Sequence, residues 1–248
     1  MFSEEPYCGP PPILEGLWSR WTFDPLAALI MIGIVALWLL AGRRDSTGRR
    51  ALLCVLCLFI VAFFSPLCAL TVALFSARVF HHVVLISIAA PLIAIALPWR
   101  TGPVFPLAAA TMLHVLIVWI WHAPLAYDWA VVGALPYWLM QLSLLSTGWV
   151  FWRELFLSHG RSGASLIALI AFVAQMGLLG ALLVFAPFAI YPIHFETTTA
   201  FGISALADQQ LAGLVMWVPA MLPYIAAALI LLMRLLKDQP EAEAGWSR

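Results

Sequence analysis

The sequence contains few charged residues. Asp, Glu, Lys and Arg make up only 10% of its 248 residues, whereas an ordinary soluble domain has about 25%. Acidic and basic residues are equal in number, so no net charge favours binding to nucleic acid. With 64% hydrophobic residues and a mean hydropathy of +1.01, the chain is expected to lie in a lipid bilayer.

Motifs of known catalytic chemistry are also missing. The sequence has no nucleophile elbow, phosphate-binding loop or metalloprotease helix. Ser76 and Ser87 lie near histidines but lack a third, orienting group, so they are more simply helix-packing residues. The N-terminal stretch has neither a basic start nor an apolar core, so we expect no cleavable signal peptide. We therefore expect a protein that is not an enzyme.

Long apolar runs dominate the rest of the chain. A helix that spans a bilayer needs about 20 largely apolar residues. Seven segments meet or nearly meet this length: residues 25–42, 51–65, 72–97, 104–123, 135–156, 164–188 and 207–236. They predict an all-α, polytopic membrane protein, with a proline-rich arm at 1–24, a seven-helix bundle at 25–236 and a tail at 237–248. Asp24-Pro25 is typical of a helix N-terminus, and Ser65-Pro66 predicts an irregular helix end.

The basic residues predict the orientation. With the N-terminus outside, the inner connections and the tail hold nearly all of them: Arg43, Arg44, Arg49, Arg50, Arg100, Arg153, Arg161, Arg234, Lys237 and Arg248. Only Arg20 then lies outside, and Arg78 lies within a helix. Because loops rich in Lys and Arg stay in the cytoplasm, we expect an N-out, C-in protein of the cell inner membrane.

The third segment carries three ionisable residues, Arg78, His81 and His82, into an apolar stretch. Such residues are costly within a bilayer and usually face a protein interior or a wet cavity. Residues four apart share a helix face, so Arg78 and His82 should face one space and His81 another. Counted from an outer start near Thr71, both histidines lie roughly 15 Å deep, near the bilayer centre.

Two further histidines lie on the fourth segment, which is expected to run outward. His122 lies at its outer mouth, and His114 lies roughly 12 Å deeper. On a regular helix these two cannot bind one ion together, because they point in different directions. His114 instead matches the depth of His81 and His82, and is their predicted partner.

Polar residues from several segments are expected near the outer surface. Asp208, Gln141, His122 and Arg78 all fall in the outer third of the predicted membrane domain. If they converge, they form a polar vestibule that leads down to the deeper histidines.

The four cysteines form two pairs. Cys54 and Cys57 make a CxxC on a lipid-embedded helix, where cysteine usually packs as a small apolar residue, with a metal or redox role as the alternative. Cys8 and Cys68 are both expected outside, where thiols can oxidise. A disulfide between them and a shared soft-metal site are both open.

Several stretches resemble the CtaG family of cytochrome c oxidase assembly factors. They are FSARVFHH with AAPLIAIALP, then WIWHAPLAYD, LLSTGWVFWREL and SALADQQLAGLVMWVP, and the likeness covers most of the chain from Trp18 to Lys237. In the family pattern the third helix starts with histidines four apart, and the fifth helix carries another. Here Arg78 stands at the first position, His82 at the second and Gln141 at the third.

The resemblance implies an assembly factor that assists copper insertion into a haem-copper oxidase. Cytochrome c oxidase subunits and a copper chaperone would be its partners. The resemblance and the chemistry of the side chains together nominate His81, His82, His114 and His122 as copper ligands, supported by Arg78, Asp128, Asp208 and Gln141. In this scheme Asp208 is the counter-charge of Arg78, whose permanent positive charge repels a metal ion.

Three other interpretations use the same residues. The buried polar groups could simply hold the helices together through hydrogen bonds. Two facing histidines could ligate haem in a membrane electron-transfer protein, which an optical spectrum would detect. A small-ion transporter would be expected to show internal repeats and broken helices, and the sequence shows neither clearly.

Overall fold

The computed structural model describes residues 6–42, 45–97, 105–158 and 162–237. Within these ranges the fold is all-helical, as predicted, and has no strand. The α-helices are α1 (Pro25–Leu40), α2 (Ser46–Phe59), α3 (Leu67–Ala73), α4 (Phe75–Val83), α5 (Ala90–Ala96), α6 (Leu107–His122), α7 (Pro124–Val131), α8 (Ala134–Leu157), α9 (Ser162–Phe185), α10 (Ala205–Trp217) and α11 (Leu222–Lys237). Shorter helical turns are η1 (Leu14–Ser19), η2 (Ile60–Phe64), η3 (Val84–Ala89), η4 (Pro192–His194), η5 (Thr197–Phe201) and η6 (Pro219–Met221).

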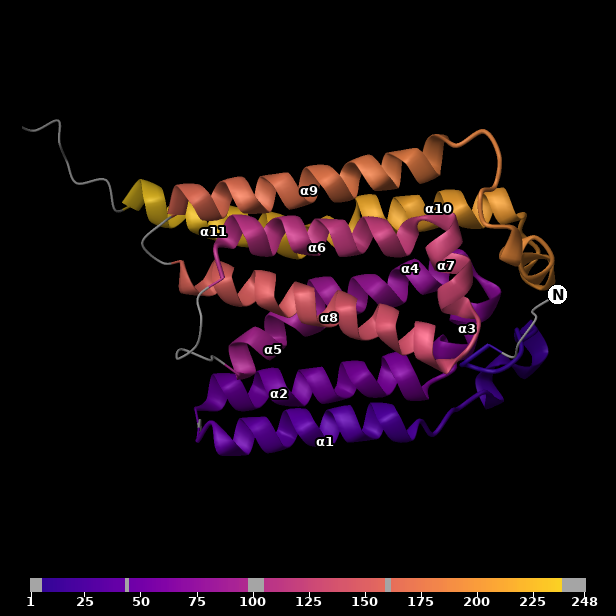
Figure 1. Cartoon of the computed structure of the whole chain (residues 1–248), viewed down its shortest axis with the longest axis horizontal. Helices are drawn as coiled ribbons and strands as arrows, with labels where there is room; N and C mark the ends of the chain where they lie inside the picture. The colour runs from indigo at the N-terminus through magenta and orange to yellow at the C-terminus, as the bar shows by residue number, and fades with distance from the viewer. Residues whose placement is uncertain (1–5, 43–44, 98–104, 159–161, 238–248) are drawn as a thin grey trace, which may run out of the picture.

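The long helices lie side by side along one axis (Figure 1). α1 and α2 form one side of the bundle, α9 lies on the other with α10 and α11, and α4, α5, α6 and α8 lie between them. The N-terminal arm, α3, α7 and the segment 186–204 gather at one end, which we call the arm end. The last described residues of α11 lie at the opposite end.

Four helical stretches are long and apolar enough to cross a membrane: Ser46–Phe64, Phe75–Ala96, Gly163–Phe185 and Ala205–Leu236. The bent pair α6 and α7 would make a fifth. α1, with 16 residues, is shorter than a typical span. These are the helices of a membrane protein, while the finer count of seven spans stays a prediction. The orientation also stays a prediction. Of the basic residues on which it depends, Arg43, Arg44, Arg100, Arg161 and Arg248 lie outside the described residues.

Two predicted helix boundaries are confirmed. The Asp24 carboxylate accepts hydrogen bonds from the backbone N–H groups of Leu26 and Ala27, at 2.9 and 3.1 Å, and Pro25 is the first residue of α1. The second predicted segment ends irregularly, because η2 is a π-helical turn that stops at the extended residue Ser65.

The third predicted segment begins later than expected. Residues 67–73 form the separate helix α3, and the chain is extended at Leu74 (φ −125°, ψ 128°) before α4 starts at Phe75. His82 therefore lies about 10 Å from the start of this helix at Phe75, and not at the centre of the helix. The reason is a contact distant in sequence: Asp208 on α10 accepts a hydrogen bond from the Phe75 N–H at 2.6 Å and so caps α4.

Pro91 does not simply kink this helix. It follows the π-helical turn η3, in which the Ala90 N–H bonds to the Leu85 carbonyl five residues back. In that register Pro91, which has no N–H, leaves the Ile86 carbonyl without a backbone donor. Side chains replace it: Trp152 Nε1 donates to that carbonyl at 3.1 Å and the Tyr224 hydroxyl at 3.3 Å.

Candidate functional site

The three ionisable residues of α4, Arg78, His81 and His82, are all buried inside the bundle, as predicted from their cost in lipid. The Arg78 guanidinium lies over the ring of Tyr137 on α8, 5.3 Å from its centroid. His81 points elsewhere and makes an edge-on contact with Phe63 in η2 at 5.1 Å. Arg78 and His81 thus contact different aromatic rings, Tyr137 and Phe63.

His82 meets His122, at the end of α6. Their ring centroids are 5.7 Å apart and the rings are nearly perpendicular, at 83°. His122 Nδ1 lies 2.7 Å from the Val118 carbonyl, so that nitrogen carries the proton and Nε2 keeps a free lone pair. This Nε2 and both ring nitrogens of His82 are buried without a hydrogen-bond partner. A pair of imidazoles with unused nitrogens is unusual in a protein interior.

His114 is not the partner of His81 and His82, which corrects the sequence prediction. Its ring stacks on Phe172 at 4.7 Å and on Phe151 at 5.9 Å, and its Nδ1 lies 3.0 Å from the Thr147 hydroxyl. Gly148 makes room for it, since a Cβ there would lie 3.2 Å from His114 Cε1. The late start of α4 moves His82 outward to the level of His122 and away from that of His114.

Asp208 does not hold Arg78, a second correction. Its two carboxylate oxygens accept hydrogen bonds from the N–H groups of Phe75 and Ser76, at 2.6 and 3.2 Å, and from the Ser76 hydroxyl. Asp208 therefore sits at the N-terminus of α4, where the helix dipole favours a negative charge. Its role is to fix α4 against α10, and it acts on the histidines only through the position of that helix.

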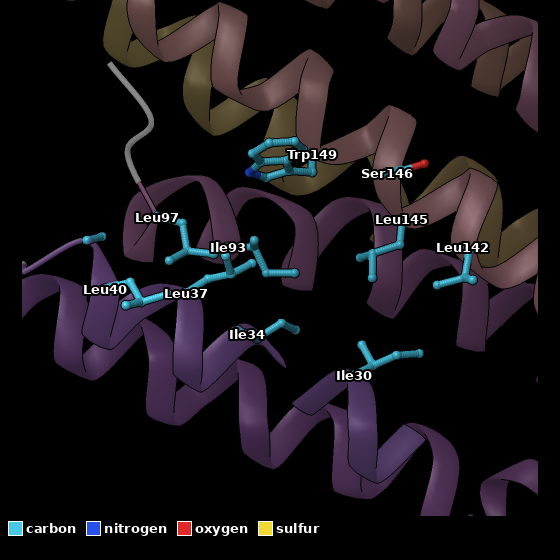
Figure 2. Close-up of a pocket in the computed structure, with 11 residues that line it drawn as sticks. Ile30, Ile34, Leu37, Leu40, Ile93, Leu97, Leu142, Leu145, Ser146 and Trp149 are labelled. Atoms are coloured by element: carbon cyan, nitrogen blue, oxygen red, sulfur yellow. The ribbon is translucent and has the colours of Figure 1, made fainter. Parts of the chain in front are cut away.

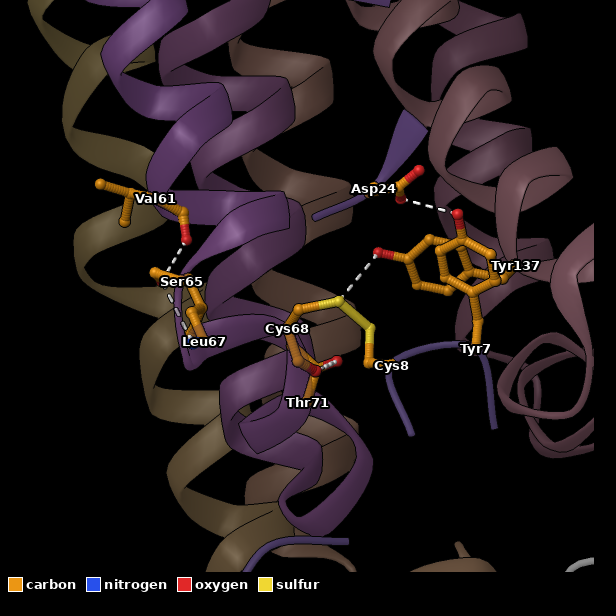
Figure 3. The surroundings of a disulfide bond; sticks show 9 residues. All are labelled: Tyr7, Cys8, Asp24, Val61, Ser65, Leu67, Cys68, Thr71 and Tyr137. Carbon is orange, nitrogen blue, oxygen red and sulfur yellow. Dashed lines mark hydrogen bonds between the residues drawn. A yellow bond between two sulfur atoms is a disulfide. The ribbon is translucent and has the colours of Figure 1, made fainter. Parts of the chain in front are cut away.

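The N-terminal arm is fastened to α3 and lies against Tyr137 (Figure 3), the residue whose ring Arg78 covers. A disulfide joins Cys8 to Cys68 of α3, so of the two open alternatives the structure contains the disulfide. Tyr7 stacks on Tyr137 with centroids 4.6 Å apart, and the Tyr137 hydroxyl lies 3.8 Å from Cys68 Sγ. Tyr137 therefore contacts both Tyr7 of the arm and the guanidinium of Arg78.

Tyr7 also ties the arm to α1. Its hydroxyl donates to the Asp24 carboxylate at 2.7 Å. Burial, with this hydrogen bond in second place, raises the pKa of Tyr7 to about 12, so the phenol stays protonated as a donor. By contrast, Cys54 and Cys57 are free and exposed on α2.

The two remaining predicted site residues differ in position. Gln141 is buried on α8, one turn after Tyr137 on the same face, and both its amide atoms lack a partner. Asp128 is half-buried on α7, and its Oδ1 is buried without a hydrogen bond. Gln141 thus faces the same side of α8 as the residue that stacks under Arg78, whereas Asp128 lies on the helix that bends away by 73° after His122.

Aromatic side chains close the site at the arm end. Tyr191 stacks on Phe75 at 3.9 Å, and its hydroxyl donates to the His122 carbonyl at 2.7 Å. His194 Nε2 lies 2.7 Å from the Tyr127 hydroxyl, and burial lowers the pKa of His194 to about 3, which keeps it neutral. The predicted open vestibule is therefore covered by the segment that carries Tyr191 and His194.

A cavity of about 470 Å³ lies elsewhere, between α1, α5 and α8 (Figure 2). Its lining is mostly apolar and consists of Ile30, Ile34, Leu37, Leu40, Ala41, Ile93, Leu97, Leu142, Leu145, Ser146 and Trp149. None of the predicted site residues lines it. The cavity and the histidine pair are thus separate features.

The chemistry of the site follows from its donors. In the part of the chain that the structure describes, no group of three or more His, Cys, Asp or Glu side chains is placed to hold a metal ion. The His82 and His122 pair offers at most two ligands, with a cation nearby at Arg78. A closed four-ligand zinc site is therefore not formed by these residues.

The comparison with known families decides the identity. The sequence profile of the cytochrome c oxidase caa3 assembly factors, Caa3_CtaG, matches residues 34–238. The chain belongs to this family. As a family member it is a cytochrome c oxidase assembly factor that associates with the oxidase. No curated protein and no solved structure shows a significant match to the chain.

The sequence of this Caa3_CtaG protein did not point to two residues that contact the candidate site, Tyr137 and Tyr191. Tyr137 lies under Arg78, and Tyr191 holds the His122 carbonyl, yet both look like ordinary interfacial tyrosines in the sequence. In the sequence, Tyr137 is connected to the predicted site only by its position one turn before Gln141 on the same helix face.

Proposed function

We propose that this protein delivers copper to a haem-copper oxidase during its assembly, without catalysing a covalent reaction, and that His82 and His122 hold the ion in transit as Cu(I). Membership of the family indicates that the protein assembled is a cytochrome c oxidase. The observation that supports the copper step is the pair of buried, neighbouring imidazoles, in which both nitrogens of His82 and Nε2 of His122 have no hydrogen-bond partner. Imidazole is a good copper ligand.

The geometry of the pair suits one shared ion. With metal–nitrogen distances of about 2 Å, two imidazoles on one ion have ring centres roughly 6 Å apart. The observed 5.7 Å is close to this value. Zinc prefers four ligands, whereas the d¹⁰ ion Cu(I) accepts two, so a two-histidine site favours Cu(I).

A two-ligand site also suits a cargo that must leave. The positive charge of Arg78, one turn from His82 on the same helix, weakens the hold on any cation. An additional ligand from the oxidase subunit would then draw the ion away. A chaperone that brings the copper is a further proposed partner.

The covered end of the delivery site would face the outer side of the inner membrane. We place the arm end outside. Seven transmembrane segments would then cross the bilayer: α1, α2 with η2, α4 to α5, α6, α8, α9, and α10 with α11. The basic residues of the sequence favour this orientation. The disulfide between Cys8 and Cys68 supports it as well, since disulfides persist on the oxidising side.

Histidine variants test the proposal. His82→Gln and His122→Gln should each weaken Cu(I) binding by the purified protein at least tenfold, measured by competition with a Cu(I) chelator, and should lower the copper content of the oxidase in cells. His114→Gln is the matched control, because His114 is equally buried but stacks among phenylalanines. Equal binding by all three variants and the parent would contradict the copper role of the pair.

A further inference from the structure

Arg78 is a buried cation without a visible counter-charge. Arg78 is only 1% exposed, and its Nε and Nη1 atoms have no hydrogen-bond partner. Among the described residues no carboxylate lies within 4 Å of it. The Tyr127 and Tyr137 hydroxyls interact with the guanidinium but carry no negative charge, and a buried guanidinium is costly unless it is paired with an anion.

Two carboxylates at the arm end, Asp208 and Asp24, are already engaged in helix caps. Asp208 accepts three hydrogen bonds at the N-terminus of α4. Asp24 accepts three as well, from the N–H groups of Leu26 and Ala27 and from the Tyr7 hydroxyl. Each carboxylate caps a helix, so neither can turn to Arg78 without exposing backbone donors.

A second buried polar group lies on the face of α8 that Arg78 covers. Arg78 lies over the ring of Tyr137, and Gln141 follows Tyr137 by one turn on the same face of α8. The Gln141 amide is buried, and neither its nitrogen nor its oxygen has a hydrogen-bond partner. His82, one turn after Arg78 on α4, also has two buried ring nitrogens without a partner. Arg78, Gln141 and His82 thus bring unused N–H groups to the region between α4 and α8.

We propose that a small monovalent anion of halide type binds between the Arg78 guanidinium and the Gln141 amide. Charge-assisted hydrogen bonds from Arg78 would hold it, and the amide N–H group and a ring N–H of His82 would complete its shell. A halide fits better than a carboxylate because the arm and Tyr137 enclose the site, and Arg78 and Gln141 are each only 1% exposed.

This anion site does not depend on copper, but it bears on the proposed delivery of copper. A bound anion would cancel the charge of Arg78 and reduce its repulsion of a cation at His82. By linkage, anion and Cu(I) would then strengthen each other's binding. That consequence rests on the proposed function, whereas the site itself can be tested in metal-free protein.

The test uses the full chain, purified in detergent without metal. Its melting temperature should rise and saturate with chloride or bromide, relative to gluconate at equal ionic strength. Arg78→Gln should abolish this rise, while Arg234→Gln, the same charge change at an exposed position, should retain it. Gln141→Leu keeps the charge and should weaken halide binding about tenfold.

Crystals grown in bromide give the direct readout. We expect an anomalous peak within hydrogen-bonding distance of the Arg78 nitrogens and of the Gln141 amide. An ordered water without anomalous signal at that place would overturn the proposal, and so would an equal halide response in the parent and in both Arg78→Gln and Gln141→Leu. Because copper is absent throughout, these outcomes are independent of the histidine variants.

Discussion

The arm end of the bundle and the region around the apolar cavity are held together by different forces. At the arm end a disulfide, two capping carboxylates and several tyrosine hydroxyls make directional bonds between distant parts of the chain. Around the cavity, α1 meets α5 and α8 through leucine and isoleucine side chains (Figure 2). In lipid such apolar contacts have little driving force over contacts with acyl chains.

The difference shows where this membrane protein fixes its geometry. Bonds that are directional and shielded from water hold atoms in one arrangement, which the histidine pair and Arg78 require. The apolar region tolerates loose packing because acyl chains can replace missing side-chain contacts. The site lies at the rigid end, so perturbations there should be far larger than perturbations around the cavity.

Removal of the disulfide should have the largest effect. Cys8→Ser combined with Cys68→Ser frees a link between residues 60 apart in sequence, and the loss of that constraint on the unfolded chain should cost about 4 kcal/mol. The measurement is the melting temperature in detergent under non-reducing conditions. Cys54→Ser with Cys57→Ser, at free and exposed positions, is the matched control and should change stability by less than about 0.5 kcal/mol. Equal melting of the two double variants would show that the arm contributes nothing.

Asp208→Asn should come next. The asparagine keeps one acceptor oxygen but loses the charge, and its NH₂ group would face the donors of Phe75 and Ser76. We expect a loss of about 2–3 kcal/mol in the free energy of unfolding, and a weaker Cu(I) affinity because α4 shifts. Asp128→Asn on α7 is the control, since Asp128 caps no helix. If both variants unfold alike, Asp208 does not organise the arm end.

The sequence predicts the local features of both regions well. The apolar runs, the Asp24 cap and the irregular end at Ser65 depend on neighbouring residues, and each is confirmed. The burial of Arg78 and His82 follows from the cost of such groups in lipid, and it is confirmed as well.

Features that depend on partners far along the chain could not be predicted. The start of α4 at Phe75 is set by Asp208, 133 residues away, so the depth of His82 and its pairing with His122 instead of His114 were missed. The arm over Tyr137 depends on a disulfide that the sequence left as one of two alternatives. The segment that carries Tyr191 showed no sign of closing the site until its contacts with Phe75 and His122 were seen.

The smallest expected effect gives the sharpest comparison, because one chemical change can be made in both regions. Ser76→Ala at the arm end removes a hydroxyl that donates to the buried Asp208 carboxylate, and should cost about 1.5–3 kcal/mol. Ser146→Ala at the cavity removes an exposed hydroxyl that bonds only the Ser143 carbonyl of its own helix, at 3.3 Å. Alanine also favours the helix, so this change should stay within about 0.5 kcal/mol. Thermal unfolding of both variants in the same detergent measures the difference. Similar losses would mean that the two regions are equally constrained, and that the rigidity of the histidine pair must come from packing instead of from the bonds at the arm end.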